Sequence, residues 1–170
     1  NDGHVILGKR IESTLYDEIL FQSRISQKRF PFLRDHKLFN ITALGGTNYL
    51  SMWIRAVIDL HPGHTIELSS IRFLQPLCLF EEAEVELQTI LYPSLGAYKY
   101  KAEVLSRTNT SSEWLIHATC YVSLMKKSKA SVEGVQQYLK GMKQSMAPES
   151  LYEMTLNRRI TLSDSHLLTK

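Results

Sequence analysis

The chain has 170 residues, of which 44% are hydrophobic and 22% are charged, and its formal net charge is +3 at pH 7. This length and composition predict one globular domain, or one domain with part of a neighbour, and no basic stripe suggests a nucleic-acid partner. Because the sequence holds no run of about 18 apolar residues, no membrane span is predicted.

The first half of the chain predicts a strand, a loop and a long helix. Residues 14–25 alternate well enough for a strand, and residues 30–44 read as a loop in which Pro31 breaks any helix. Residues 44–60 carry apolar side chains at helical spacing around more than one stripe, so we expect a helix buried on several sides. The sequence His61-Pro62-Gly63 predicts its end.

Four strand candidates follow the helix, and they cover residues 67–74, 82–91, 97–107 and 113–124. The breaks between them are short, which favours an antiparallel meander. Together these elements predict an α+β fold in which one antiparallel sheet wraps around a long central helix. Cys78 and Cys120 are far apart and lie in apolar, strand-like runs, which indicates two buried free thiols in a reducing, cytoplasmic compartment.

The remainder of the chain changes character. Residues 1–125 are expected to form the folded domain, residues 126–148 a linker that contains a short helix at 132–142, and residues 149–170 the start of an incomplete second unit. No CxxC or HExxH spacing occurs, so no metal site is predicted.

One constellation carries chemistry: Asp35-His36 precedes the pair Gly45-Gly46 by nine residues, and the pair opens the predicted helix. An imidazole can move a proton near neutral pH, and the backbone N–H groups of a helix start can hold a developing oxyanion. The alternatives remain a loop histidine that bonds to Asp35 and a glycine pair that merely turns the chain. His117 lies in an alternating strand, which favours a satisfied structural histidine.

Three segments resemble the dehydratase domain of modular polyketide synthases, and specifically its N-terminal half. Residues 4–8 (HVILG) are similar to the family's HPLLG, residues 32–38 (FLRDHKL) to WLxDHxV, and residues 45–50 (GGTNYL) to PGxxYLE. The strand and turn at residues 71–77 (IRFLQPL) also resemble the family's strand that enters a Pro-Leu turn. The resemblance implies one half of a double hot-dog fold, with residues 149–170 opening the second half.

The resemblance also implies an activity. Such dehydratases remove water from a 3-hydroxyacyl thioester that acyl carrier protein bears on phosphopantetheine, and they need no further cofactor. Carried over to this sequence, His36 is the base that takes the C2 proton, and Gly45 and Gly46 bind the thioester oxygen. The implied partners are acyl carrier protein, neighbouring synthase domains, and either a second hot-dog or a second copy of the chain.

Besides Val5, which replaces the proline of HPLLG, this sequence departs from the family pattern in three places. Gly45 replaces the proline before the helix glycine, and residues 159–166 lack the glycines, the proline and the phenylalanine of GYxYGPxF. The aspartate that assists departure of the hydroxyl is expected beyond residue 170, and Asp164 aligns upstream of it, with the family's proline. An inactive docking domain and a homodimeric single hot-dog thioester enzyme therefore stay as alternatives.

Overall fold

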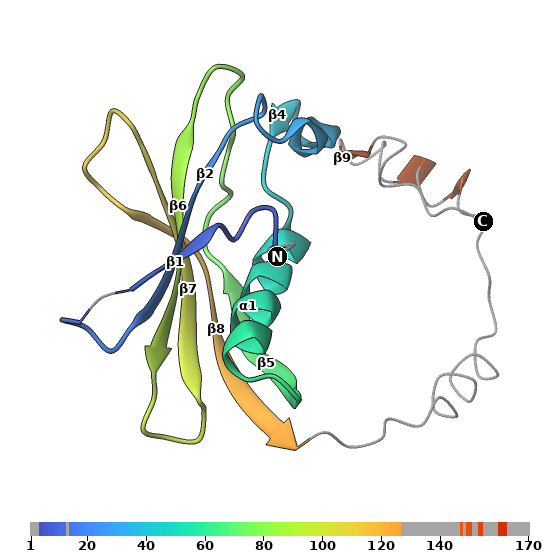
Figure 1. The fold of residues 1–170 in the computed structure, drawn as a ribbon. Coiled ribbons are helices and arrows are strands. Elements are labelled where there is room, and N and C mark those ends of the chain that lie inside the picture. The colour runs from blue at the N-terminus through green and yellow to red at the C-terminus, as the bar shows by residue number, and fades with distance from the viewer. Residues whose placement is uncertain are drawn as a thin grey trace.

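The structure is a computed structural model that describes residues 4–12, 14–126, 147, 149–150, 153–154 and 160–162. Its main element is a six-stranded antiparallel sheet in the order β1-β2-β6-β7-β8-β5, and helix α1 lies along one face of that sheet (Figure 1). The sheet strands are β1 (Lys9–Ile11), β2 (Ile19–Ile25), β5 (His64–Phe73), β6 (Val85–Pro93), β7 (Tyr100–Thr108) and β8 (Leu115–Lys126). This arrangement is the hot-dog fold that the sequence predicted.

Helix α1 (Gly46–Leu60) confirms the predicted helix almost to the residue. Its side chains at spacings of three and four residues are buried against the sheet: Tyr49, Met52, Trp53, Ala56 and Val57. The expectation of burial on several sides is wrong, because the described chain covers only that one face. Ile54 and Ile58, on the other side, remain 39% and 44% exposed.

The predicted meander is right for three strands and wrong for the first. Strands β6, β7 and β8 pair consecutively, but β5 pairs with β8 at the edge of the sheet, and β2 occupies the place beside β6. The cause is the helix, which carries the chain across the face of the sheet and delivers β5 to the far edge. The segment 74–84 then returns the chain to the centre, so the break before β6 is a crossover rather than a hairpin.

The loop predicted at residues 30–44 contains three short elements. They are the 3₁₀ helix η1 (Pro31–Asp35), strand β3 (His36–Leu38) and strand β4 (Ile41–Thr42). Pro31 opens η1 rather than breaking it, because a proline at the first position of a helix loses no hydrogen bond. The predicted N-terminal strand was too long, since β2 begins only at Ile19, and β1 was missed.

Most of residues 127–170 lies outside the described residues, including the helix expected at 132–142. One described piece, β9 (Ile160–Leu162), pairs antiparallel with β3 in a small sheet of order β4-β3-β9. Cys78 and Cys120 are free thiols, as predicted, but only Cys120 is buried, and Cys78 is partly exposed. Within the described part, no helix is long and apolar enough to cross a membrane.

The buried face of α1 should carry most of its stabilising energy. Met52→Ala is expected to lower the free energy of unfolding by about 2–5 kcal/mol, because it empties space in a fully buried position. Ile58→Ala, on the exposed side of the same helix, is the matched control and should change it by well under half as much. Urea denaturation followed by circular dichroism measures both, and equal losses would contradict the one-sided burial.

Candidate active site

Helix η1 delivers His36 to the site. Leu33 anchors η1 by its buried side chain, and the backbone N–H of His36 donates to the Leu33 carbonyl to close the last turn. The chain then extends, so His36 is the first residue of β3 and its side chain is half-buried. Asp35, the last residue of η1, ends the turn directly before it.

The hairpin of β3 and β4 clamps the imidazole. Leu38 pairs with Ile41 across a two-residue turn in which Phe39 and Asn40 have φ angles of 51° and 65°, as a type I′ turn requires. This turn brings Ala43 back beside His36. The Ala43 N–H donates to the His36 carbonyl at 3.1 Å, and His36 Nδ1–H donates to the Ala43 carbonyl at 2.9 Å.

The second of these bonds fixes the tautomer of the imidazole. A backbone carbonyl can only accept, so the neutral ring must carry its proton on Nδ1. Nε2 then carries the lone pair that can take a proton. Ala43 thus orients the ring and also sets which nitrogen is basic.

Two further backbone bonds hold the approach to the helix. Leu44 N–H donates to the Leu77 carbonyl at 2.9 Å, and Leu79 N–H donates to the Thr42 carbonyl at 2.8 Å. Hydrogen bonds therefore hold residues 42–44 both to His36 and to residues 77–79. Because α1 begins directly after this segment, the same bonds fix the position of the helix start.

The helix start lies against the imidazole. Gly45 is the N-cap, and the helix has no side-chain cap there and no acidic residue in its first turn. A Cβ added at Gly45 would lie 3.7 Å from His36 Nε2, so the basic nitrogen and the helix start are neighbours. The structure therefore brings together the three residues that the sequence singled out.

Gly46 is constrained by a different neighbour. A Cβ added there would lie 3.1 Å from Cζ of Phe73, which is tighter than ordinary van der Waals contact. The Phe73 ring, at the end of β5, thus covers the first turn of α1 and also packs against Tyr49 with ring centroids 6.0 Å apart. A side chain at position 46 would displace that ring.

These elements line an open pocket of about 400 Å³. Its lining is mainly apolar, with the His36 imidazole and the backbone of Gly46 among its polar groups. Burial is the main cause that raises the pKa of Tyr49 to about 12, so its hydroxyl stays protonated at neutral pH. The lining residues are His36, Leu38, Ala43, Leu44, Gly46, Tyr49, Phe73, Leu74, Gln75 and Pro76.

The sequence did not identify the wall formed by Phe73–Pro76. Phe73 ends the edge strand β5 and the other three residues follow it; none of the four is titratable, so nothing in their types indicates a site. Their only signal was the similarity of residues 71–77 to the dehydratase pattern. Tyr49, predicted as a core residue, belongs both to the core and to the pocket lining.

Such a site can move a proton on a bound acyl group. It combines a base of fixed tautomer, an apolar pocket of acyl size and the positive end of a helix that can stabilise an oxyanion. Among the described residues, no group of His, Cys, Asp or Glu side chains is placed to hold a metal ion.

Comparison with known proteins identifies the family. The family described as polyketide synthase dehydratase domain matches residues 4–107, and the chain belongs to it. The mycoketide-CoA synthase of Mycobacterium tuberculosis is 24% identical over 115 residues, which cover 68% of this chain and 3% of that protein. The spectinabilin polyketide synthase system protein NorB of Streptomyces orinoci is 27% identical over 122 residues, which cover 68% and 5%.

Solved structures agree on the fold. An inactive variant of the CurK dehydratase superposes with a TM-score of 0.83 at 22% identity, covering 98% of this chain and 58% of that one. The dehydratase domain from the CurF module of curacin polyketide synthase gives 0.82 at 23% identity, covering 96% and 60%. The chain thus spans somewhat over half the length of these solved domains and a few per cent of the curated synthases.

The backbone at Gly45 should accept the proline that the family pattern has there. Its φ of −66° is the angle that a proline ring imposes, and its N–H donates to no backbone or side-chain acceptor among the described residues. Gly45→Pro is therefore expected to raise the free energy of unfolding by about 0.4–1 kcal/mol, because it restricts the unfolded chain. Denaturation of this variant beside Gly45→Ala measures the gain, and a loss of stability would show that position 45 needs its N–H or another angle.

Proposed function

We propose that this chain is the base-bearing half of a dehydratase that acts on a 3-hydroxyacyl thioester carried by acyl carrier protein. The observation that carries the proposal is the hydrogen bond from His36 Nδ1–H to Ala43, which leaves the basic Nε2 beside the start of α1 at an acyl-sized pocket. This geometry suits proton abstraction next to a carbonyl.

The reaction follows from the placement of these groups. Nε2 of His36 takes the proton from C2, and the electron pair of that C–H bond forms the C2–C3 double bond. The C3–O bond breaks, and the hydroxyl leaves as water with a proton from a carboxylic acid of the second hot-dog half. Charge that develops on the thioester oxygen is stabilised by the N–H groups at Gly45 and Gly46, which raises the acidity of C2–H.

The structural relatives support a base in the first hot-dog half and an acid in the second. Two of the similar CurK dehydratase structures are inactive mutants, one with a histidine replaced by phenylalanine and the other with an aspartate replaced by asparagine. Those two positions are further apart in that protein than His36 is from Lys170. The comparison supports a histidine in the first half and an acid in the second.

The exposed side of α1 and the edge strand β5 form the surface that we assign to the second half. β5 ends the sheet, and Phe73, Ile54 and Ile58 expose apolar side chains on these two elements. An open edge with apolar neighbours favours a pairing partner. β9 supports the same assignment, because it brings the chain from beyond residue 159 onto β3, the strand of His36.

Removing the base should abolish proton exchange. His36→Ala is expected to slow deuterium exchange at C2 of butyryl-N-acetylcysteamine thioester in D₂O roughly 10²–10⁴-fold, the usual contribution of a general base. His64→Ala, an exposed histidine at the start of β5, is the matched control and should leave the rate unchanged. The measurement is proton NMR of the thioester with the 170-residue chain.

The outcomes separate the alternatives. A wild-type rate in His36→Ala overturns the proposal. A chain that binds carrier protein but exchanges no C2 proton, even with the second half of a dehydratase supplied, is a docking domain. Exchange that rises with chain concentration as a dimer forms indicates a homodimeric single hot-dog enzyme.

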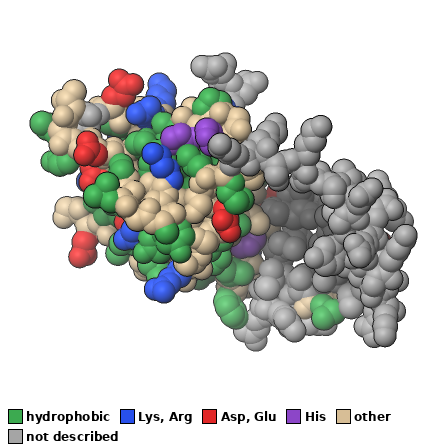
Figure 2. Space-filling model, turned by 90° about the horizontal axis from the view of Figure 1, so that it is seen from below, with side chains coloured by type: hydrophobic (Ala, Val, Ile, Leu, Met, Phe, Trp, Pro, Cys, Tyr) green, Lys and Arg blue, Asp and Glu red, His purple; other side chains and the backbone are tan. Residues whose placement is uncertain are grey.

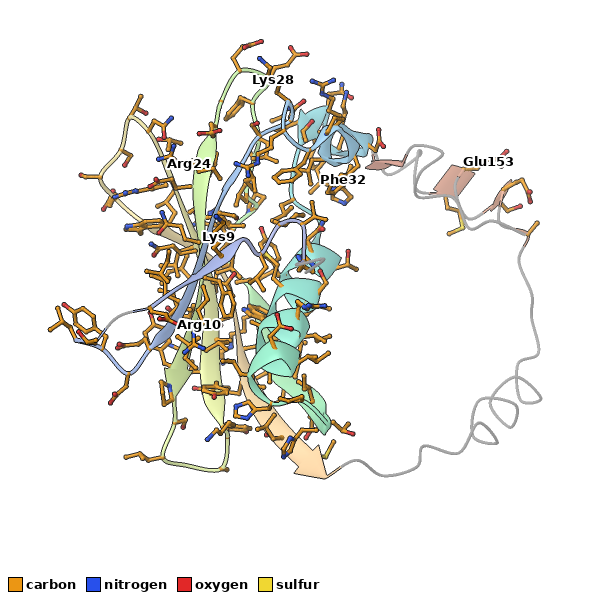
Figure 3. All side chains as sticks on the ribbon, in the orientation of Figure 1. Lys9, Arg10, Arg24, Lys28, Phe32 and Glu153 are labelled. Atoms are coloured by element: carbon orange, nitrogen blue, oxygen red, sulfur yellow. The ribbon has the colours of Figure 1, made fainter. Side chains whose placement is uncertain are left out.

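A cluster of cations beside the site supports an acidic partner such as acyl carrier protein. Lys28, Arg29, Arg34 and Lys37 are all exposed, and none forms an ion pair with another described residue. Figure 3 places Lys28 and Phe32 at the η1 end of the molecule. The face seen from below in Figure 2, by contrast, carries charges of both signs without a large patch of either.

Reversing these charges should weaken carrier-protein binding alone. The double variant Lys28→Glu/Arg34→Glu is expected to raise the Kd for acyl carrier protein roughly tenfold at low salt and less at high salt, because surface charges are screened. The Kd for the small N-acetylcysteamine thioester should not change. Lys9→Glu/Arg10→Glu on β1, away from η1 in Figure 3, is the matched control, and an equal effect there would contradict the assignment.

A further inference from the structure

His117 is a buried titratable residue that the proposed chemistry leaves unused. Its side chain is 3% exposed, and it lies where the pairing of β7 with β8 changes register. Val104 pairs with Ala118 and Leu105 pairs with Ile116, so His117 is the extra residue of a β-bulge in β8. A bulge interrupts the alternation of a strand and redirects the side chain that it carries.

The ring of His117 forms hydrogen bonds to strand β7 and to the segment that follows β5. Its Nδ1–H donates to the Gln75 carbonyl at 3.2 Å, and the Ser106 hydroxyl donates to its Nε2 at 2.7 Å. Because the Gln75 carbonyl can only accept, the neutral ring carries its proton on Nδ1, and the Ser106 hydroxyl then donates to Nε2. Burial lowers the pKa of His117, which keeps this neutral arrangement at physiological pH.

Two more hydrogen bonds join the segment around Gln75 to β8. Leu74 N–H donates to the His117 carbonyl at 2.8 Å, and Gln75 Nε2 donates to the Ile116 carbonyl at 2.9 Å. Leu74, Gln75 and Pro76 form the wall of the pocket that contains His36. Three hydrogen bonds therefore hold the wall against β8. The side chain and the backbone carbonyl of His117 make two of them, and the Ile116 carbonyl makes the third.

We propose that His117, oriented by Ser106, is a positioning residue that holds the Leu74–Pro76 wall and thereby sets the fit of the acyl chain beside His36. The proposal rests on the proposed function in one respect, that the pocket takes an acyl thioester. A shift of the wall would change which acyl chains place C2 at Nε2, and small misplacements of reacting groups lower rates steeply. The imidazole of His117 itself transfers no proton to the substrate.

Two substitutions separate this role from simple packing. His117→Asn keeps an amide N–H close to the place of Nδ1, so it retains the bond to Gln75, whereas His117→Leu removes it. We expect His117→Leu to weaken the binding of 3-hydroxybutyryl-N-acetylcysteamine thioester roughly tenfold and to reduce the discrimination between this probe and its decanoyl analogue. His117→Asn should restore most of both, and NMR titration measures them.

A ligand-free measurement makes the test independent of the proposed function. In the wild-type chain, long-range ¹H–¹⁵N spectra should show His117 with a proton on Nδ1 and none on Nε2. In His117→Leu, amide exchange at Leu74 should quicken at least tenfold while the amides of α1 keep their protection, and His117→Asn should reverse this. Ser106→Ala is a milder change that serves if His117→Leu fails to fold; it removes the bond that holds Nε2 and should quicken the same amide to a smaller extent.

Each result decides the question. Wild-type selectivity and wild-type Leu74 exchange in His117→Leu would overturn the proposal, as would equal defects in the Asn and Leu variants. If the wild-type chain binds no thioester, the proposed function fails, and the tautomer and exchange data alone then decide whether His117 holds the wall.

Discussion

The site depends on one side chain-to-backbone contact, the hydrogen bond between the His36 imidazole and the Ala43 carbonyl. It closes the β3–β4 hairpin on the ring, assigns the basic nitrogen and presents that nitrogen to the start of α1. The hairpin can return so tightly only because Phe39 and Asn40 adopt left-handed backbone angles. Phe39 has a Cβ that disfavours this conformation and is 70% exposed, so the fold accepts local strain there where the hairpin closes on His36.

The second constraint is that one helix face serves both the core and the pocket. Tyr49 is the first buried residue of α1, and it stands where the hydrophobic core meets the apolar lining of the site. The core below it is filled by Met52, Trp53 and Val57, which fix the helix against the sheet. The floor of the pocket is therefore part of the hydrophobic core, whereas its Phe73 wall belongs to an exposed edge strand.

Sequence patterns predicted those helices and strands whose apolar residues repeat at a regular spacing. Helix α1 and strands β6, β7 and β8 follow from their own apolar spacing, so local reasoning found them. The place of β5 was missed because strand order depends on where α1 delivers the chain, which no local pattern records. The proximity of His36, Gly45 and Gly46 was anticipated from their spacing and the family likeness, but the clamp by Ala43 was not, since a backbone carbonyl carries no residue-specific signal.

The irregularities of the sheet are concentrated beside the site. The pairing of β5 with β8 shifts between Ser69 and Arg72, where Ser70 has a φ of 49°, and the pairing of β7 with β8 shifts at His117. The first shift falls just before β5 leaves the sheet, and the second falls at the residue of β8 that bonds to Leu74 and Gln75. Regular pairing would continue the alternation of the strand and turn these side chains to other faces. The two shifts instead let the edge strand β5 lead into one side of the pocket, and His117 and Phe73 lie where the strand changes direction.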